Sequence, residues 1–273
     1  MKHFSLAFYL LIITFSISSI NASELTEKSF SNLMSSSGWG KQITDFQKVT
    51  VYGLEQAAVT NSADSLNIKS EIELTFQQDR INELLFQQLK VILSEEEATS
   101  LLGWYQSDLG KLITQQELNA STAESYQKMM ESESVLTKEG QRKILSQQII
   151  SASMEFQKVS KIQVNTFLTI STAAAVVTDN KEFDQAEKRK AFSEHMIQRE
   201  DAFNGMLVLI SLFSLKDVNE SDIEKYLSFL QNSEYQKFNT SVLNEMIVAL
   251  DKLIIVMKQN LTEFYTKKKS EES

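Results

Sequence analysis

The chain has 273 residues, a formal net charge of −9 and neither Cys nor Pro. Its acidic balance gives it no electrostatic reason to bind nucleic acid or an anionic lipid surface, and without Cys it cannot be stabilised by disulfides. Seven Gly and no Pro are too few turn residues for a sheet-rich protein of this length, so we expect an all-α fold.

The N-terminal segment, 1–22, has the three parts of a secretory signal peptide. Lys2 and His3 form a basic start, an apolar run covers 4–20, and Ala22 is a small residue at the junction. We expect export to the periplasm or the medium, with cleavage after Ala22 and no stable membrane span in the remaining chain. An uncleaved anchor is the alternative, because a run of 17 residues is near the lower limit for spanning a bilayer.

Two segments of the chain return later in the same order. The hexapeptide at 45–50, DFQKVT, is similar to EFQKVS at 155–160, and the segment 95–106 is similar to 220–231. Two matches in register, each keeping charge and apolar positions, predict a duplicated unit of about 110–125 residues.

The duplication predicts a helical bundle built from two multi-helix repeats. The first repeat would cover 23–134 and the second 135–273, with Phe46 matching Phe156 and Trp104 matching Phe229. We expect these paired residues to take equivalent places in the two repeats.

A helix start is predicted at 94–97, where Ser94 stands three residues before Glu97. In this capping box the Ser hydroxyl accepts from a first-turn amide and the Glu carboxylate reaches back to the Ser amide. Ser221 and Glu224 have the same spacing in the second half. We interpret the acidic cluster at 95–97 as part of a helix cap and not as a metal or acid-base site.

The residues after this helix predict a structural corner. Ser107 is expected to cap a helix that starts near Asp108, as Ser233 would cap the one near Glu234. Trp104 and Tyr105 would pack into the elbow between the helices. Trp104 is interpreted as a core aromatic, with a ligand-stacking role as the alternative.

The segment 93–111, LSEEEATSLLGWYQSDLGK, resembles the bacterial domain of unknown function numbered 2059. Members of that family tend to have an acidic helix start, an aromatic pair, a Ser and then Gly-Lys. The matching positions here are Glu95 to Glu97, Trp104, Tyr105, Ser107, Gly110 and Lys111. The resemblance covers about 81–140, centred on 81–115, with a degenerate second copy in which Gln236 replaces the Gly. It implies an exported, helical bacterial protein and no particular reaction.

Residues for catalysis or metal binding are scarce. After removal of the signal segment the one His is His195, so a two-His metal site, a His-based triad and a Cys-His pair are all excluded. His195 stands among charged residues, which favours a solvated ion-pairing role. We predict no catalytic residue, no metal and no cofactor.

The C-terminal helix, expected from Glu234 to about Lys267, has the most regular apolar pattern in the chain. Its apolar positions alternate in steps of four and three residues, and they define a candidate contact face: Leu243, Ile247, Leu250, Ile254, Met257 and Leu261. We expect this wide face to lie between at least two helices or to leave a groove for an apolar guest.

Two function classes remain open from the sequence. The first is an exported, non-catalytic helper protein that offers an apolar groove to an envelope polypeptide or an apolar ligand. The second is an exported hydrolase that uses carboxylates alone. The lack of His pairs, Cys and Gly-rich loops favours the first class.

Overall fold

The computed structural model describes residues 23–57, 62–120, 122–136 and 140–271. Over these ranges the chain forms thirteen α-helices and no β-strand beyond one isolated bridge, which confirms the all-α prediction. The expected signal segment, 1–22, lies outside the described residues.

The helices follow one another with short connections. The first seven are α1 (Glu27–Ser36), α2 (Trp39–Ala57), α3 (Ser62–Thr75), α4 (Gln78–Ile92), α5 (Glu95–Gln106), α6 (Asp108–Ala120) and α7 (Ala123–Leu136). The other six are α8 (Gly140–Ser153), α9 (Glu155–Val177), α10 (Gln185–Gln198), α11 (Glu200–Ser214), α12 (Glu220–Leu230) and α13 (Ser233–Glu271). None of the helices in the described ranges combines the length and apolarity that a membrane crossing needs.

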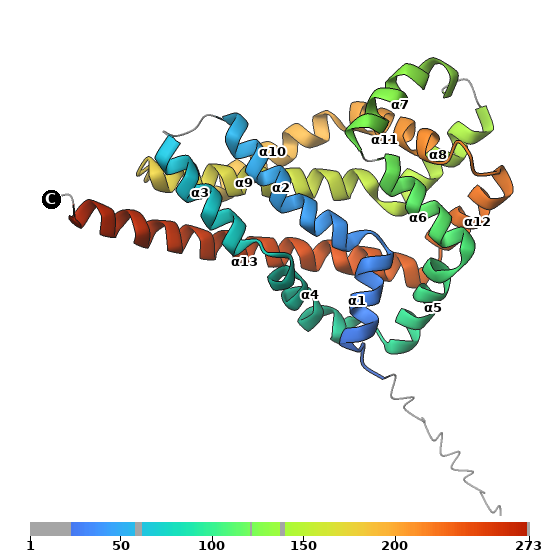
Figure 1. Ribbon diagram of the computed structural model, residues 1–273, viewed down its shortest axis with the longest axis horizontal. Coiled ribbons are helices and arrows are strands. Elements are labelled where there is room, and N and C mark those ends of the chain that lie inside the picture. Colours follow the sequence, from blue (N-terminus) through green and yellow to red (C-terminus); the bar gives the residue numbers. More distant parts are fainter. Residues whose placement is uncertain (1–22, 58–61, 121, 137–139, 272–273) are drawn as a thin grey trace, which may run out of the picture.

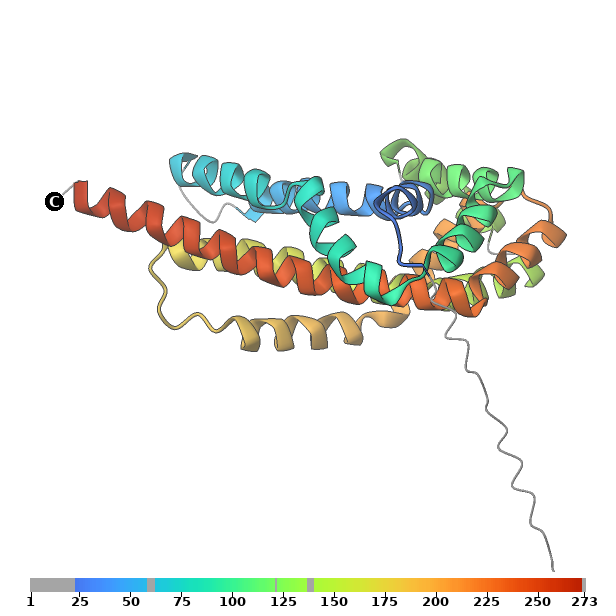
Figure 2. The ribbon, with the colours of Figure 1, turned by 90° about the horizontal axis from the view of Figure 1, so that it is seen from below.

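The two longest helices, α9 and α13, lie side by side in the middle of the molecule (Figures 1 and 2). Helices α2 and α3 cover one face of this pair, α10 covers the other, and α4 crosses α13. The shorter helices α5 to α8, α11 and α12 gather at the end opposite the C-terminus. The central pair therefore links the two ends of the molecule.

The apolar face of α13 lies in the core. Leu243, Leu250, Ile254, Met257 and Leu261 are at most 2% exposed, and Ile247 is partly buried against the same core. Helices α9, α4 and α3 pack against α13. The candidate contact face is therefore covered by other parts of the same chain and is closed to an outside partner.

The capping prediction is confirmed at α5 and wrong in the second half. At α5 the Glu97 amide donates to Ser94 Oγ (3.2 Å) and the Ser94 amide donates to Glu97 Oε2 (2.8 Å), which completes the capping box. At α12 the cap is Asn219, not Ser221, because Asn219 Oδ1 accepts from the Asp222 amide at 2.9 Å. An Asn side chain caps as well as Ser, so the helix starts earlier than the Ser-x-x-Glu spacing indicated.

Of the two caps predicted at the corners, the one at Ser107 is confirmed and the one at Ser233 is wrong. Ser107 caps α6, since its Oγ accepts from the Gly110 amide at 3.0 Å. The Ser233 cap is wrong, because Asn232 Oδ1 accepts from the Glu234 amide at 2.8 Å and Ser233 is already the first residue of α13.

The expected duplication is not established by the fold. The segment 45–50 begins at the seventh residue of α2, whereas 155–160 begins at the first residue of α9. The expected boundary after 134 falls inside α7, and one apolar core contains residues from both halves. The two halves therefore do not form separate units with cores of their own.

The α5–α6 corner is tight enough to require Gly110. A Cβ atom at this position would lie 2.1 Å from the carbonyl oxygen of Trp104, which is a backbone atom and has little freedom to move. A single residue, Ser107, separates the two helices. The α12–α13 corner has two residues between its helices, and there α13 carries the buried Tyr235 in its first turn.

Changing Gly110 to Ala is expected to lower the free energy of unfolding by about 2 kcal/mol, because the added methyl group forces the two helices apart. The control is Gly103→Ala, since a Cβ atom there meets nothing within 4 Å. That change in a helix interior should stabilise the protein by up to about 1 kcal/mol. Urea unfolding measures both, and a Gly110→Ala protein as stable as the wild type would contradict the argument.

Candidate functional site

The backbone breaks between α8 and α9 at Met154, which has a positive φ of 59°. A left-handed conformation costs a residue with a side chain about 1–2 kcal/mol, and such strain is found most often at functional sites. The break also leaves the last carbonyl groups of α8 without partners in a continued helix.

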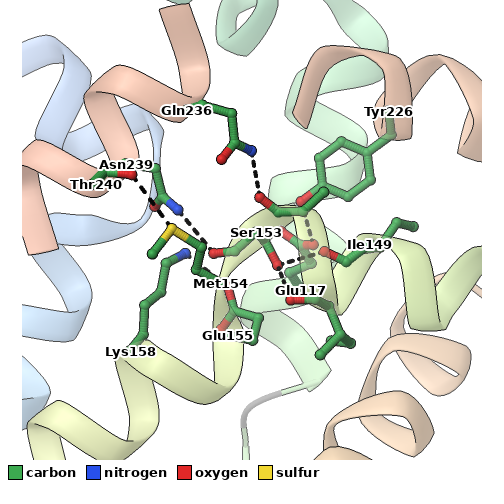
Figure 3. A network of polar contacts seen from close by, with 12 residues as sticks. Glu117, Ile149, Ser153, Met154, Glu155, Lys158, Tyr226, Gln236, Asn239 and Thr240 are labelled. Atoms are coloured by element: carbon green, nitrogen blue, oxygen red, sulfur yellow. Dashed lines mark hydrogen bonds and ion pairs between the residues drawn. The ribbon is translucent and has the colours of Figure 1, made fainter. Parts of the chain in front are cut away.

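Side chains of α13 hold this break in place (Figure 3). Gln236 Nε2 donates to the carbonyl oxygen of Ala152 at 2.6 Å, and Asn239 Nδ2 donates to that of Ser153 at 2.9 Å. Asn239 is fully buried. Each bond contributes about 1 kcal/mol, so together they offset the strain at Met154.

A cavity of about 300 Å³ lies beside the break, and we name it the polar cavity after its charged lining residues. Its walls come from α2, α6, α8, α9, α11 and the turn between α1 and α2. The polar lining residues include Lys41, Gln42 and Asp45 of α2, Glu117 of α6, Glu155 of α9 and Ser211 of α11. Residues distant in sequence therefore line one cavity, which is partly open to the surface.

Glu117 is the most perturbed carboxyl group in the cavity. The residue is partly buried and its carboxyl group is surrounded by protein atoms, so desolvation raises its pKa from 4.5 to about 7. The neighbouring charge of Glu155 acts in the same direction, whereas Lys158 and the Tyr226 hydroxyl, which donates to Glu117 at 2.7 Å, oppose it. Glu117 therefore changes its charge near neutral pH.

The second carboxylate, Glu155, is held by a buried cation. Lys158 Nζ lies 2.8 Å from Glu155 Oε1, and the Lys158 side chain is only 7% exposed. The same ammonium group lies 5.1 Å from the centre of the Trp39 ring, within range of a cation–π interaction. Lys158 therefore fixes the Glu155 carboxylate at the start of α9.

Three oxygen atoms on the cavity residues have no hydrogen-bond partner within the described protein: Ser37 Oγ, Gln42 Oε1 and Ser211 Oγ. Ser211 is 6% exposed. It lies on the cavity side of α11 together with Leu207, Ile210 and Ser214. The three oxygens are closed to solvent, so they are unpaired groups beside the cavity and not acceptors on its surface.

A second and larger depression, the apolar groove, has a volume of about 730 Å³ and lies between α7, α8, the start of α9 and α11. Its apolar lining includes Met130, Ile150, Phe156, Met206, Leu209 and Leu212. Glu133, Glu200, Asp201 and Lys143 add charged groups to the lining. Helix α11 lies between the groove and the polar cavity, because its residues line both.

The predicted corner residues do not line the polar cavity, but they connect to it through aromatic rings. Trp104 is partly buried and stacks on Phe229, with ring centres 4.5 Å apart and an interplanar angle of 9°. Tyr105 meets the Phe229 ring edge to face, and Trp104 also stacks on Tyr226, whose hydroxyl reaches Glu117. Trp104 and Phe229, expected as counterparts, are thus in direct contact.

The other predicted residues lie away from both depressions. Lys111 is exposed on α6, and His195 is exposed in the last turn of α10, where its ring lies near Phe192. Sequence reasoning missed Glu117, Ser211 and Lys158. Among the carboxylates that line the cavity, only Asp45 and Glu155 stand in a sequence pattern that singles them out, because they begin the two matching hexapeptides.

Within the described ranges, no three His, Asp or Glu side chains are grouped so that they could hold a metal ion. Comparison with known proteins found no matching family model, no similar curated protein and no similar solved structure.

Replacing Glu117 with Gln is expected to change how stability depends on pH. The pKa of Glu117 is about 7 in the folded protein against 4.5 for the ordinary group, so the folded state binds the proton more tightly. In the wild type, this tighter proton binding stabilises the folded state fully below pH 4.5. The contribution is lost as the pH rises to about 7, and it amounts to about 3 kcal/mol. The Gln side chain of the variant does not titrate, so the variant lacks this pH dependence. Urea unfolding of both proteins across this range measures it; parallel stability curves would show that Glu117 has an ordinary pKa.

Proposed function

We propose that this protein is an exported, non-catalytic binding protein that holds an apolar segment of a partner polypeptide in the apolar groove. The groove itself is the observation that supports the proposal. Its volume of about 730 Å³ lies within the range of ligand-binding clefts, and its lining includes the buried residues Phe156, Leu209 and Leu212.

The lining of the groove favours a polypeptide with basic residues beside its apolar ones. Met130 and Met206 are flexible, polarisable side chains of the kind used by surfaces that adapt to varied peptide sequences. Glu133, Glu200 and Asp201 outnumber Lys143, so the charged part of the lining is acidic. Complementary charge would orient a basic, amphipathic segment and speed its association.

Gly205 offers a direct test, because it is an exposed residue of α11 that lines the groove and a Cβ atom there meets nothing within 4 Å. Gly205→Leu is expected to fill the groove without lowering stability, since Leu favours a helix more than Gly does. The probe is a labelled amphipathic helical peptide of Leu and Lys, with its Glu-for-Lys analogue as the charge control. Fluorescence anisotropy should show at least a tenfold loss of affinity for the basic peptide.

The matched control is Gly103→Leu, an exposed helical Gly in open space that lines neither depression. It should bind the basic peptide as the wild type does. Equal affinity of the Gly205 and Gly103 variants would place peptide binding outside the groove and contradict the proposal, as would equal affinity for the basic and acidic peptides.

Export is part of the proposal and rests on the basic start, apolar run and small residue within 1–22. We expect the mature protein to begin at Ser23 and to be recovered from the periplasm or the medium. Mass spectrometry of the intact protein measures this. A Met1-containing chain held in the membrane would favour the anchored alternative.

We also infer an origin by duplication of a helical unit, of the kind that the resemblance to the domain numbered 2059 concerns. Support comes from α5 and α12, whose buried residues correspond at a constant offset of 125: Ala98 with Ile223, Leu101 with Tyr226, Leu102 with Leu227, and Tyr105 with Leu230. The caps Ser94 and Asn219, and Ser107 and Asn232, keep the same offset. An experimental structure in which α4–α6 and α11–α13 cannot be superposed with Trp104 on Phe229 would refute it.

A further inference from the structure

We propose that the apolar groove binds a helical segment of about three turns in one direction only, with the basic end of the segment at the start of α11 and its other end at Lys143. The proposal rests on the proposed function, because both concern the same groove. It adds which segments fit the groove and how they lie in it, and apolar contact alone decides neither.

Helices α8 and α11, which form two walls of the groove, run in opposite directions. At the start of α8, Arg142 donates to the carbonyl oxygen of Leu215 at 3.0 Å, just after the end of α11. Just after the end of α8, the ring centre of Phe156 lies 6.4 Å from that of Phe203, in the first turn of α11. Lys143 is near the start of α8, so it lies toward the end of α11 and away from its first turn.

The charged groups of the lining are therefore separated along the groove. Glu200 and Asp201 are the first two residues of α11 and lie at one end, whereas Lys143 lies at the other. None of these three side chains has an ion-pair partner among the residues that the structure describes. A bound segment thus meets uncompensated charge of opposite sign at its two ends.

Two neighbouring charges leave this polarity in place. Glu133 of α7 adds a further carboxylate to the lining, so the groove as a whole stays acidic. Arg199 precedes the acidic pair in sequence, but its guanidinium lies 5.6 Å from the centre of the Phe203 ring, and neither residue lines the groove. The start of α11 therefore keeps its negative charge toward the groove.

The length of the groove sets the length of the segment. Glu200 and Leu212 both line the groove, and the rise of an α-helix places them about 18 Å apart along α11. A helical segment of about three turns has the same length. Between the charged ends the lining is mainly apolar, which suits the row of apolar side chains at every third or fourth position of an amphipathic helix.

Gly205 lies on α11 between the two ends and lets a partner backbone come close. It is exposed, and a Cβ atom there would meet nothing within 4 Å, so the space in front of it is open. Glycine has no side chain to hold a partner helix away from α11. A helix seated against Gly205 can direct its apolar side chains toward Phe156 and Leu209.

Apolar contact supplies the affinity of this site, and the charges supply the direction. Asp201 and Lys143 are exposed and Glu200 is partly buried. Ion pairs at such positions are weak and are screened by salt, whereas burial of a large apolar side chain contributes more. The charges should therefore change the affinity of a matched segment severalfold and should not produce binding on their own.

The test uses three labelled helical peptides of about twelve residues that share one row of Leu side chains. The polarised peptide has two Glu in its first turn and two Lys in its last, the mixed peptide has the same residues interspersed, and the neutral peptide has Gln at all four positions. Fluorescence anisotropy at low salt should show that the wild type binds the polarised peptide about threefold more tightly than the mixed one, or better. The preference should disappear in about 1 M salt.

The variant Glu200→Gln with Asp201→Asn should remove this preference and leave the affinity for the neutral peptide unchanged. Because both peptides are compared on both proteins, a difference in the helicity of the free peptides cancels. The matched control is Glu187→Gln with Glu194→Gln, which removes the same charge from two exposed residues of α10 that line neither depression. This control should keep the preference.

Direction is measured with a nitroxide spin label on the basic end of the polarised peptide. Backbone amide signals near Asp201 should broaden, and those near Lys143 should not. Broadening near Lys143 or equally at both ends, no preference for the polarised peptide, or a preference that survives in the Glu200 and Asp201 variant would overturn the proposal. If the neutral peptide still binds the wild type and loses affinity with Gly205→Leu, the groove remains the peptide site without a direction; if no peptide binds the wild type, the proposed function fails as well.

Discussion

The arrangement of this protein depends on the clamp that α13 places on the broken backbone between α8 and α9. Gln236 and Asn239 donate hydrogen bonds to the carbonyl groups of Ala152 and Ser153. Without these bonds, nothing at the break would offset the free energy that the left-handed conformation of Met154 costs. A continuous helix through this point would move Glu155 and Lys158 from the place where they meet the cavity and Trp39. Asn239 is fully buried and Gln236 partly buried, so the break is fixed beside the core that holds α9 against α13.

Helix α11 lines both the apolar groove and the polar cavity. Its Met206 and Leu209 line the apolar groove, and its Ser211 and Ser214 line the polar cavity. A helix presents different residues every few positions, so one short element can serve both sides. The side chain of Leu212 extends the groove, whereas Ser211, its neighbour in sequence, lies on the cavity side.

The aromatic rings at the α5 and α12 ends add rigidity to this region. Trp104 stacks on Phe229 and Tyr226, and the Tyr226 hydroxyl reaches Glu117. Stacked rings contribute about 1 kcal/mol beyond the area that they bury. The environment of Glu117 is therefore set by a contact between residues 109 positions apart in the chain.

The sequence predicts a local feature correctly where residues within one or two helical turns decide it. The helical period of α13, the capping box at Ser94 and the cap at Ser107 involve neighbours within one or two turns, and each is present in the structure. The caps predicted at Ser221 and Ser233 are wrong, because Asn219 and Asn232 stand nearby and cap a helix as well as Ser does. No sequence rule decides between two residues of similar capping strength.

The sequence by itself determined that the chain is helical, where α5 and α6 begin, that a long amphipathic helix ends the described chain, and which face of that helix, α13, is apolar. Only the tertiary structure decided that this face is covered by α9, α4 and α3, and that the groove and the cavity lie elsewhere. Glu117 stands in an ordinary polar stretch, QQELNA, and nothing there indicates a pKa of about 7. Its burial results from packing against distant helices, and a periodic pattern records only which side of a helix is apolar, not what covers it.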